Sequence, residues 1–298
     1  MIIHPIQMMI IGAQKAGTSS LLRYIAQHPE ICTHNQREFH YFADDLEYAK
    51  GYSSAFRRYF KWEQLDGQVL LAKNAGLMYL SEAMRRVRDH NPDIHLVLSL
   101  RHPVDRAYSA YWFARRRGLE DLDTFEAAIK ADPSRFGNDL SKQRLCAYLE
   151  KSVYVKYLIE LFGLFHKEQI HVFLLEDIKQ DPIGVCQTLY RLYDEIDSAF
   201  TPQTDRRHNV AAQARSEALA RLMWSKETFS GFKYMLRRIL PGWVVDRIRK
   251  ALVHINQKDF VPPPMNPETR IELINYFKPF NAQLSELLGR DLSHWDVL

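Results

Sequence analysis

The sequence predicts an α/β fold, a three-layer sandwich in which helices cover a central, mostly parallel β-sheet. Two observations carry this prediction. Up to about Phe200, short apolar runs typical of buried strands alternate with stretches of helical periodicity, as expected for parallel strands joined by crossover helices. Beyond that point no clear strand is visible and the pattern is helical. We therefore expect a single domain over residues 1–298, with a C-terminal helical region, 200–298, that could act as a lid.

The individual elements follow from the apolar pattern. Gln7–Ile11 is a short apolar run ending at Gly12, and Ile94–Leu100 and Ile170–Leu175 are two further candidates for buried strands. Pro103 suits the first turn of a helix, and Pro29 and Pro241 mark places where helical patterns stop. Helices are expected from Gly17 to before Pro29, and over Val104–Arg117, Tyr148–Phe165, Ala211–Trp224, Phe232–Leu240, Val244–Leu252 and Pro267–Leu288.

Composition and charge narrow the class of protein. The 298 residues are 46% hydrophobic and 26% charged, which is ordinary for a globular enzyme. A formal charge of +4 suits an anionic substrate but lacks the dense basic stripe of nucleic-acid-binding proteins, so no nucleic-acid partner is expected. The three cysteines are widely spaced and form no metal or disulfide pattern. Without a recognisable signal peptide or an apolar run of about 18 residues, the chain is expected to be cytoplasmic.

A loop rich in phosphate-binding features follows the first predicted strand. Residues 12–20 read Gly-Ala-Gln-Lys-Ala-Gly-Thr-Ser-Ser and join that strand to a predicted helix. The glycines permit a tight turn, and the amides and dipole of a helix start attract an anion. Thr18 and Ser19 add hydroxyl donors, and Lys15 adds a positive charge. The fold is therefore expected to be P-loop-like.

The loop nevertheless departs from the Walker A pattern of nucleotide kinases. Gly12 and Gly17 have the Walker spacing, but Thr18 occupies the lysine position. The second predicted strand is followed by Arg101 and not by a carboxylate that could hold Mg²⁺. A nucleotide kinase is the rival enzyme class, and an inactive nucleotide- or polyanion-binding module is the non-catalytic alternative.

Two segments together resemble the family of sulfotransferases that use 3'-phosphoadenosine 5'-phosphosulfate (PAPS), in its bacterial and heparan-sulfate branch. Gln14–Ser20 is similar to the 5'-phosphosulfate loop, and Arg101–Tyr111 is similar to the second signature of the family. The resemblance implies that PAPS is the sulfuryl donor, that it leaves as PAP, and that Arg101 and Ser109 hold its 3'-phosphate. A guanidinium and a hydroxyl both suit phosphate oxygens. The loop residues expected to bind the cofactor are Lys15, Ala16, Gly17, Thr18, Ser19 and Ser20.

The segment Arg37–Phe42 resembles the acidic-aromatic segment of the same family, in which a glutamate is the general base. The resemblance implies this role for Glu38, with His40 as the neighbouring polar residue. If the segment is extended, residues 38 and 40 point to one side while Phe39 and Tyr41 point to the other. A carboxylate and an imidazole could then converge on one acceptor proton.

Lys73 occupies a position where the family often shows Glu-Lys-Ser/Thr-Pro. Ala72 replaces the glutamate, and Asn74-Ala75 replaces the Ser/Thr-Pro pair. The lysine of the motif is therefore retained, but its neighbours differ from those of the family. We expect Lys73, together with Lys15, to stabilise charge on the sulfuryl group and the departing nucleotide.

Other features carry less weight. Leu174–Asp177 resembles a structural strand-end motif of the family. Arg206, Arg207 and Arg215 lie where related chains carry a loop that closes over the nucleotide, which makes them candidates for the 3'-phosphate region. The basic residues between 233 and 250 could touch a membrane surface or an anionic acceptor, although a solvated basic face is the commoner explanation.

The predicted activity is sulfuryl transfer from PAPS, by in-line displacement, to a hydroxyl or amine of a small-molecule, sugar or lipid acceptor. Such a transfer needs alignment, charge stabilisation and removal of the acceptor proton. The nucleotide is already a good leaving group, and His34 and His40 lack an obvious third ligand, so no metal site is predicted. The acceptor is not encoded in a cofactor motif.

Overall fold

The structure is a computed structural model that describes residues 3–65, 67–131, 140–204, 212–214, 257–259 and 261–297. The chain divides into two compact units, each assembled from separate stretches of sequence. The first unit comprises Met1–His102, Val153–His208 and Pro279–Trp295. The second comprises Pro103–Ser152, Asn209–Lys278 and Asp296–Leu298.

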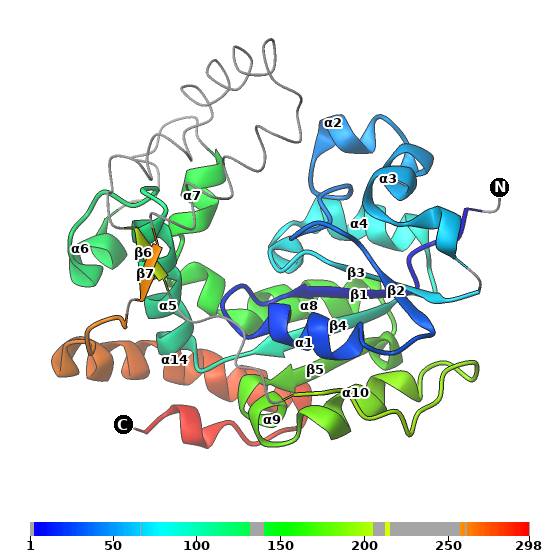
Figure 1. Ribbon diagram of the computed structural model, residues 1–298. Coiled ribbons are helices and arrows are strands. Elements are labelled where there is room, and N and C mark those ends of the chain that lie inside the picture. Colours follow the sequence, from blue (N-terminus) through cyan, green and yellow to red (C-terminus); the bar gives the residue numbers. More distant parts are fainter. Residues whose placement is uncertain are drawn as a thin grey trace, which may run out of the picture. The chain divides into compact units, whose positions relative to one another are not determined.

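A parallel β-sheet of five strands forms the centre of the first unit (Figure 1). The strand order is β2-β3-β1-β4-β5, and every pair of neighbours is parallel. The chain passes from the central β1 to the edge strand β2, returns to β3 beside β1, and then continues through β4 to the other edge at β5. Because all neighbours are parallel, the carboxyl ends of all five strands lie at one edge of the sheet. The strands are β1 (Met8–Gly12), β2 (Ile31–Thr33), β3 (Val69–Lys73), β4 (His95–Leu100) and β5 (Ile170–Leu174).

Helices cover both faces of this sheet, which confirms the predicted three-layer α/β architecture (Figure 1). On one face, alternate strand residues such as Met8, Ile10 and Val97 are fully buried against Leu21 and Leu189 of the covering helices. That face is covered by α1 (Thr18–Ile25), α9 (Leu175–Gln180) and α10 (Pro182–Tyr190), and the other by α4 (Ser81–His90) and α8 (Tyr154–Leu164). The unit also contains α2 (Asp45–Tyr48), α3 (Tyr52–Tyr59) and the 3₁₀ turns η1 (Trp62–Gln64), η2 (Leu77–Tyr79), η5 (Lys167–Gln169) and η6 (Ser293–Trp295).

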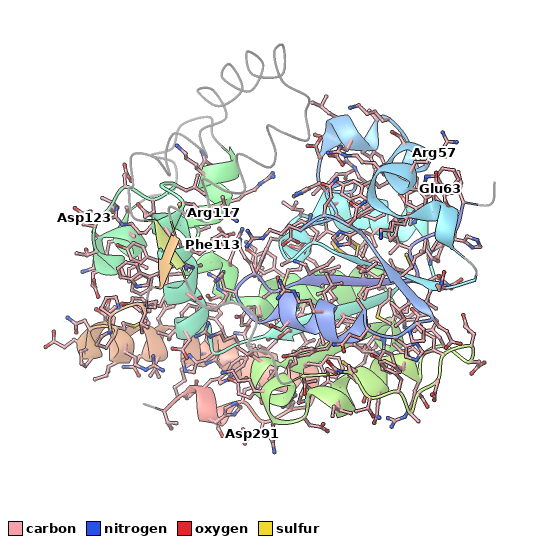
Figure 2. The ribbon with its side chains drawn as sticks, viewed as in Figure 1. Arg57, Glu63, Phe113, Arg117, Asp123 and Asp291 are labelled. Carbon is pink, nitrogen blue, oxygen red and sulfur yellow. The ribbon has the colours of Figure 1, made fainter. Side chains whose placement is uncertain are left out.

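The second unit is built around α5. The Arg106 side chain on this helix is fully buried, and its Nε donates to the Ser152 hydroxyl at 2.7 Å. At the end of the helix the Arg117 guanidinium lies 4.1 Å from the centre of the Phe113 ring (Figure 2). The elements of this unit are α5 (Pro103–Arg116), α6 (Phe125–Lys130), α7 (Leu140–Cys146), η4 (Glu150–Ser152), β6 (Ala212–Ala214), β7 (Gln257–Asp259) and the first half of α14 (Pro267–Leu288).

Three expectations about the secondary structure are wrong. Strands do occur beyond Phe200, because β6 and β7 form an antiparallel pair. A helix therefore cannot begin at Ala211, since residues 212–214 belong to β6. Strands of three residues that pair with a distant segment leave no periodic signal in the sequence. The helix expected from Tyr148 begins six residues later, at Tyr154, after a 3₁₀ turn.

Other expectations are confirmed or lie outside the described residues. The three strands are found within one residue of their expected bounds, and the last helix spans Pro267–Leu288 as predicted. Two strands, β2 and β3, were not expected. The helices expected over 232–240 and 244–252 lie outside the described residues, and a lid formed by 200–298 stays a prediction. Within the described part of the chain, no helix has the length and apolar character needed to cross a membrane.

Candidate active site

The loop between β1 and α1 is shaped to present backbone amides to an anion. Lys15 and Gly17 have left-handed φ values of 74° and 85°, a region that glycine enters freely and lysine rarely. Gly17 precedes the first turn of α1, and no side chain caps this helix. The first amides of the helix have no intrahelical acceptor, and the helix dipole adds positive potential at the same point. A phosphate or sulfate group suits this position.

Strand β4 holds the loop in place. The amide of Ala13 donates to the Ser99 carbonyl at 2.8 Å, and the Ser99 hydroxyl donates to the Ala16 carbonyl at 2.5 Å. Arg101 directly follows β4, and its Nη1 donates to the Lys15 carbonyl at 3.4 Å. The two cations predicted to contact the nucleotide, Lys15 and Arg101, therefore come from adjoining segments of the first unit.

Glu38 and Lys73 form a buried ion pair. The Lys73 Nζ lies 2.7 Å from Glu38 Oε1, and the lysine is only 1% exposed. The other carboxylate oxygen, Oε2, accepts the amide N–H of Ala75 at 3.1 Å. Burial lowers the pKa of Lys73 because it disfavours the ammonium form, and the Glu38 carboxylate opposes this shift. Both oxygens of the predicted base are thus held by partners, and its orientation is fixed.

Asn74, which stands where the family often has serine or threonine, connects this ion pair to the sheet through hydrogen bonds. The Asn74 side-chain amide donates to the Phe39 carbonyl at 3.1 Å, and the Phe39 amide donates to the Lys73 carbonyl at 2.7 Å. The Asn74 amide donates to the Ile10 carbonyl of β1 at 2.9 Å. Ile10 pairs with Lys73 across β1 and β3, two residues before the loop opens at Gly12. The ion pair and the anion loop therefore lie at the same edge of the sheet.

The two histidines near Glu38 have different environments. His34 is buried, and its Nε2 accepts the Lys73 amide N–H at 3.1 Å. Burial and the positive charge of Lys73 lower the pKa of His34 to about 4, so this ring is neutral near pH 7 and can act as an acceptor. His40 is exposed, and its backbone amide donates to the Tyr59 hydroxyl at 3.3 Å. Phe39 and Tyr41 are buried, Glu38 is half-buried and His40 is exposed, but the alternation ends at the buried Phe42, where the chain enters a turn.

Two of these supporting residues, Asn74 and His34, have no direct signal of their role in the sequence. Asn74 departs from the family's usual motif around Lys73, and His34 lacks the partners of a metal ligand. An asparagine at a strand end is a known competitor for backbone hydrogen bonds, which is the one signal that could have indicated its role. The contact between His34 and the Lys73 amide spans 39 positions and depends on the fold.

The remaining predicted residues fall into three groups. Ser109 is half-buried on α5, in the second unit. Asp177 accepts the Leu174 amide N–H at 2.8 Å and binds Arg290 through two contacts of 2.6 Å, which supports a structural role for the strand-end motif. The candidates Arg206, Arg207 and Arg215 lie outside the described residues.

A parallel sheet with a loop after β1 that opens onto a helix N-terminus is typical of α/β proteins that bind an anionic group at this edge of the sheet. A family model described as the sulfotransferase domain matches residues 5–198. The chain belongs to this sulfotransferase family, whose members transfer sulfuryl groups.

Individual relatives are distant but cover the chain widely. Heparan sulfate glucosamine 3-O-sulfotransferase 5 of Mus musculus is 24% identical over 288 residues, which cover 95% of this chain and 72% of that protein. The mouse bifunctional heparan sulfate N-deacetylase/N-sulfotransferase 4 is 25% identical and matches 98% of this chain, but only 31% of its own length is covered. The crystal structure of a sulfotransferase from Alicyclobacillus acidocaldarius has the same fold, with a TM-score of 0.68, 22% identity, and coverage of 99% of this chain and 100% of that one.

Proposed function

We propose that the protein transfers the sulfuryl group of PAPS to a hydroxyl or amine of an acceptor. The observation that carries this proposal is the position of the Glu38–Lys73 ion pair beside the anion loop. Lys73 is level with Ile10 in the sheet, and the loop begins two residues further along β1. A proton acceptor and a site for the transferring anion are thereby brought to one edge of the sheet.

The residues around the loop fit the charges of the donor. The first amides of α1 and the Lys15 side chain would hold the 5'-phosphosulfate, since both offer positive potential to an anion. Arg101, whose guanidinium adjoins the Lys15 carbonyl, would contact the 3'-phosphate. Ser109 shares this role by the resemblance of its segment to the family's second signature. PAPS supplies an activated sulfuryl group on a good leaving group.

Glu38 would take the acceptor proton. As the acceptor O–H or N–H bond breaks, its electron pair forms the new bond to sulfur, and the bond between sulfur and the 5'-phosphate oxygen breaks with its electrons leaving on PAP. The proton goes to a Glu38 oxygen, which removes the negative charge that balances Lys73. The ammonium of Lys73 is then free to stabilise negative charge on the sulfuryl group and the departing PAP. The ion pair couples proton removal to charge stabilisation.

The names of the relatives suggest one class of acceptor. The curated relatives are named for heparan sulfate, which makes a sugar hydroxyl or amine one candidate. We propose a panel of sugar, lipid and small-molecule acceptors, incubated with the protein and PAPS, with sulfated products detected by mass. Sulfation of no member of a broad panel, despite tight PAP binding, would favour the inactive binding module.

The choice of nucleotide separates this function from a kinase. Because Thr18 stands at the Walker lysine position and Arg101 follows β4, PAP should bind much more tightly than ADP or ATP, without Mg²⁺. Calorimetry with each nucleotide, with and without Mg²⁺, measures this. Equal affinity for ATP, or a requirement for Mg²⁺, would contradict the proposal.

Arg101→Ala tests the 3'-phosphate contact. Losing a charged hydrogen-bond partner costs about 1.5–3 kcal/mol, so PAP affinity should fall roughly tenfold to a hundredfold. Arg117→Ala, at the far end of α5, is the matched control and should bind PAP as the wild type does. An Arg101→Ala variant with wild-type affinity for PAP would show that the 3'-phosphate lies elsewhere.

A further inference from the structure

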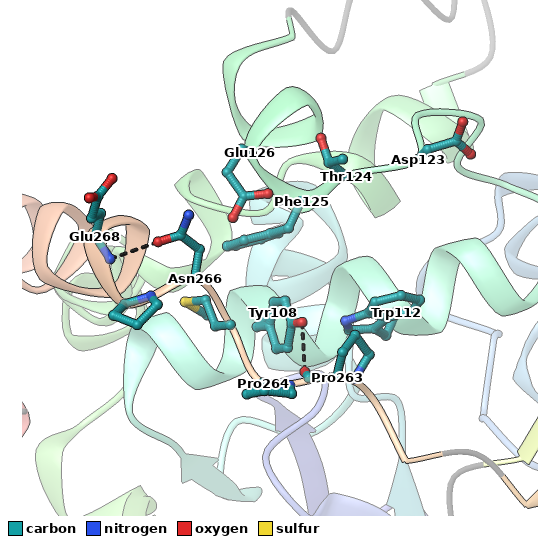
Figure 3. A pocket seen from close by; sticks show the side chains of 12 residues that line it. Tyr108, Trp112, Asp123, Thr124, Phe125, Glu126, Pro263, Pro264, Asn266 and Glu268 are labelled. Atoms are coloured by element: carbon teal, nitrogen blue, oxygen red, sulfur yellow. Dashed lines mark hydrogen bonds between the residues drawn. The ribbon is translucent and has the colours of Figure 1, made fainter.

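The second unit contains a pocket that the proposed reaction does not use. It has a volume of about 710 Å³ and lies between α5, the start of α6 and the segment 263–268 that leads into α14 (Figure 3). Three aromatic rings line it, those of Tyr108, Trp112 and Phe125. Because all of its lining residues belong to the second unit, the pocket is complete within that unit.

The rings form a corner and not a flat platform. The Tyr108 ring stands at 87° to Trp112, with 6.1 Å between ring centres, and at 80° to Phe125, with 5.1 Å between centres. The Tyr108 hydroxyl donates to the Pro263 carbonyl at 2.8 Å, which fixes the ring in place (Figure 3). Rings at right angles can offer faces to one ligand from more than one direction, the arrangement that recognises a cation.

The charged groups of the lining are all negative. Asp123, Glu126 and Glu268 line the pocket, and none of its twelve residues is a lysine or an arginine. Arg115 neutralises Asp123 at 2.8 Å. Within the described residues no ion pair neutralises Glu126 or Glu268, and Glu126 accepts only the Thr269 hydroxyl at 3.0 Å. An anionic ligand would be repelled here, whereas a cation would be attracted.

The hydrogen-bonding groups of the lining do not by themselves select a ligand. Three residues of the wall, Pro263, Pro264 and Pro267, have no N–H donor, and the Pro263 carbonyl already accepts the Tyr108 hydroxyl. Donors are nevertheless present in the Trp112 indole N–H, the Asn266 side-chain amide and the Thr124 hydroxyl. The aromatic rings and the carboxylates therefore carry the argument for a cation.

We propose that this pocket binds an organic cation, with its ammonium group against the faces of Tyr108 and Trp112 and its charge balanced by Glu126. The proposal is independent of the proposed sulfuryl transfer, because it concerns a separate set of residues. It can be tested on the full chain by measuring the binding of choline and of 3,3-dimethylbutan-1-ol, which have nearly the same shape and differ in charge.

Calorimetry should show choline binding at least tenfold more tightly than its neutral counterpart. Glu126→Gln and Trp112→Leu should each weaken choline binding at least fivefold and leave PAP affinity unchanged. Glu272→Gln, an exposed carboxylate of α14 outside the pocket, is the matched control for charge and should have no effect. Thermal unfolding of each variant identifies a loss of folding, and Glu126→Gln alone suffices if Trp112→Leu does not fold.

Four results would overturn the proposal. Equal binding of choline and the alcohol would show that charge is not recognised. Undetectable choline binding, or wild-type affinity in Glu126→Gln, would exclude the assigned cation site. Undetectable choline binding together with saturable binding of a neutral monosaccharide that Trp112→Leu weakens would assign the pocket to sugars. PAP affinity, measured in parallel, reports on the proposed reaction and remains interpretable in each case.

Discussion

Lys73 depends on Glu38 to remain charged. An ammonium group with 1% exposure is costly without a partner, and its nearest carboxylate oxygen is 2.7 Å away. A substitution of Glu38 therefore removes a proton acceptor and also leaves a buried cation unpaired. Any test of the base must separate these two effects, because loss of stability can imitate loss of catalysis.

We expect Glu38→Gln to bind PAP but to turn over about 10²–10⁴-fold more slowly, because a positioned base contributes about that much. It should also unfold at a lower temperature, since Lys73 loses its counter-charge. The double variant Glu38→Gln/Lys73→Met should recover the unfolding temperature without recovering turnover. Steady-state kinetics and calorimetry on the three proteins make the comparison.

His40 is the competing base, because an imidazole can accept a proton near neutral pH. His40→Ala should retain most of its turnover under saturating acceptor. If it is inactive while Glu38→Gln remains active, the two roles must be exchanged.

The sequence indicates candidate site residues but not their mutual contacts. The resemblance indicated Glu38 and Lys73 separately, and the structure joins them across 35 positions. The support from Asn74 and His34 could not be predicted, because the Asn74 contact requires β3 to lie beside β1 and the His34 contact requires β2 to lie beside β3. Local sequence indicates the chemistry of a side chain, whereas tertiary structure decides its partner.

At the scale of elements, the sequence indicates three of the five strands of the parallel sheet and misses the other two, β2 and β3, as well as the short pair β6 and β7. Strand β3, Val69–Lys73, is only five residues long and buried on both faces, so it shows no alternation of apolar and polar residues. Its sequence is informative only through Lys73. Strand β2 has three residues, which is too short for a periodic pattern. The order of strands in the sheet was also out of reach, because periodicity says which residues are buried and not which strand lies beside which.

Gly12 is the last residue of β1, and Met78 of η2 leaves no room for a side chain at this position. A Cβ at this position would lie 2.2 Å from Met78 Sδ. Gly12→Ala should therefore destabilise the protein by about 1–3 kcal/mol through overpacking. Because Gly12 does not have a positive φ, Gly12→Ala/Met78→Ala should recover much of this loss, as measured by chemical unfolding.

Gly17 differs from Gly12 because its backbone conformation, and not only the space around it, disfavours alanine. A Cβ there would lie 2.6 Å from Leu175 Cδ1, but φ is also 85°, a strained value for alanine. Removing the Leu175 side chain should not rescue Gly17→Ala. Equal rescue at both glycines would show that backbone conformation is not the limiting factor in the loop.

At the scale of the whole molecule, buried histidines should make stability depend on pH. The pKa values of His34, His90 and His171 are each lowered to about 4, mainly by burial. His90, for example, accepts the Ile6 amide N–H at 3.0 Å and must be neutral to do so. The unfolded chain binds protons at these sites near pH 6.5, before the folded protein does.

Stability should therefore fall as the pH decreases from about 6.5 to about 4, and level off below the folded pKa values. The lowered pKa of Asp177 adds a further loss only below its ordinary value of 3.8, outside this window. Unfolding temperatures at a series of pH values measure the slope, and His90→Gln should reduce it because glutamine accepts the same bond without titrating. A constant unfolding temperature between pH 6.5 and 4.5 would contradict this account.

The order in which the first unit is completed has a consequence for the protein's synthesis. The ribosome has completed all five strands of its sheet once it reaches Leu174. Arg290, the ion-pair partner of Asp177, is synthesised 113 positions after Asp177. Trp295, which is 1% exposed in the finished unit, comes later still. At about 5–20 residues per second, a ribosome needs roughly 6–23 s to cover this distance. During that interval the surface around His102 and Tyr154, whose rings contact Trp295 in the finished unit, lacks this tryptophan, and a chaperone has time to bind there first.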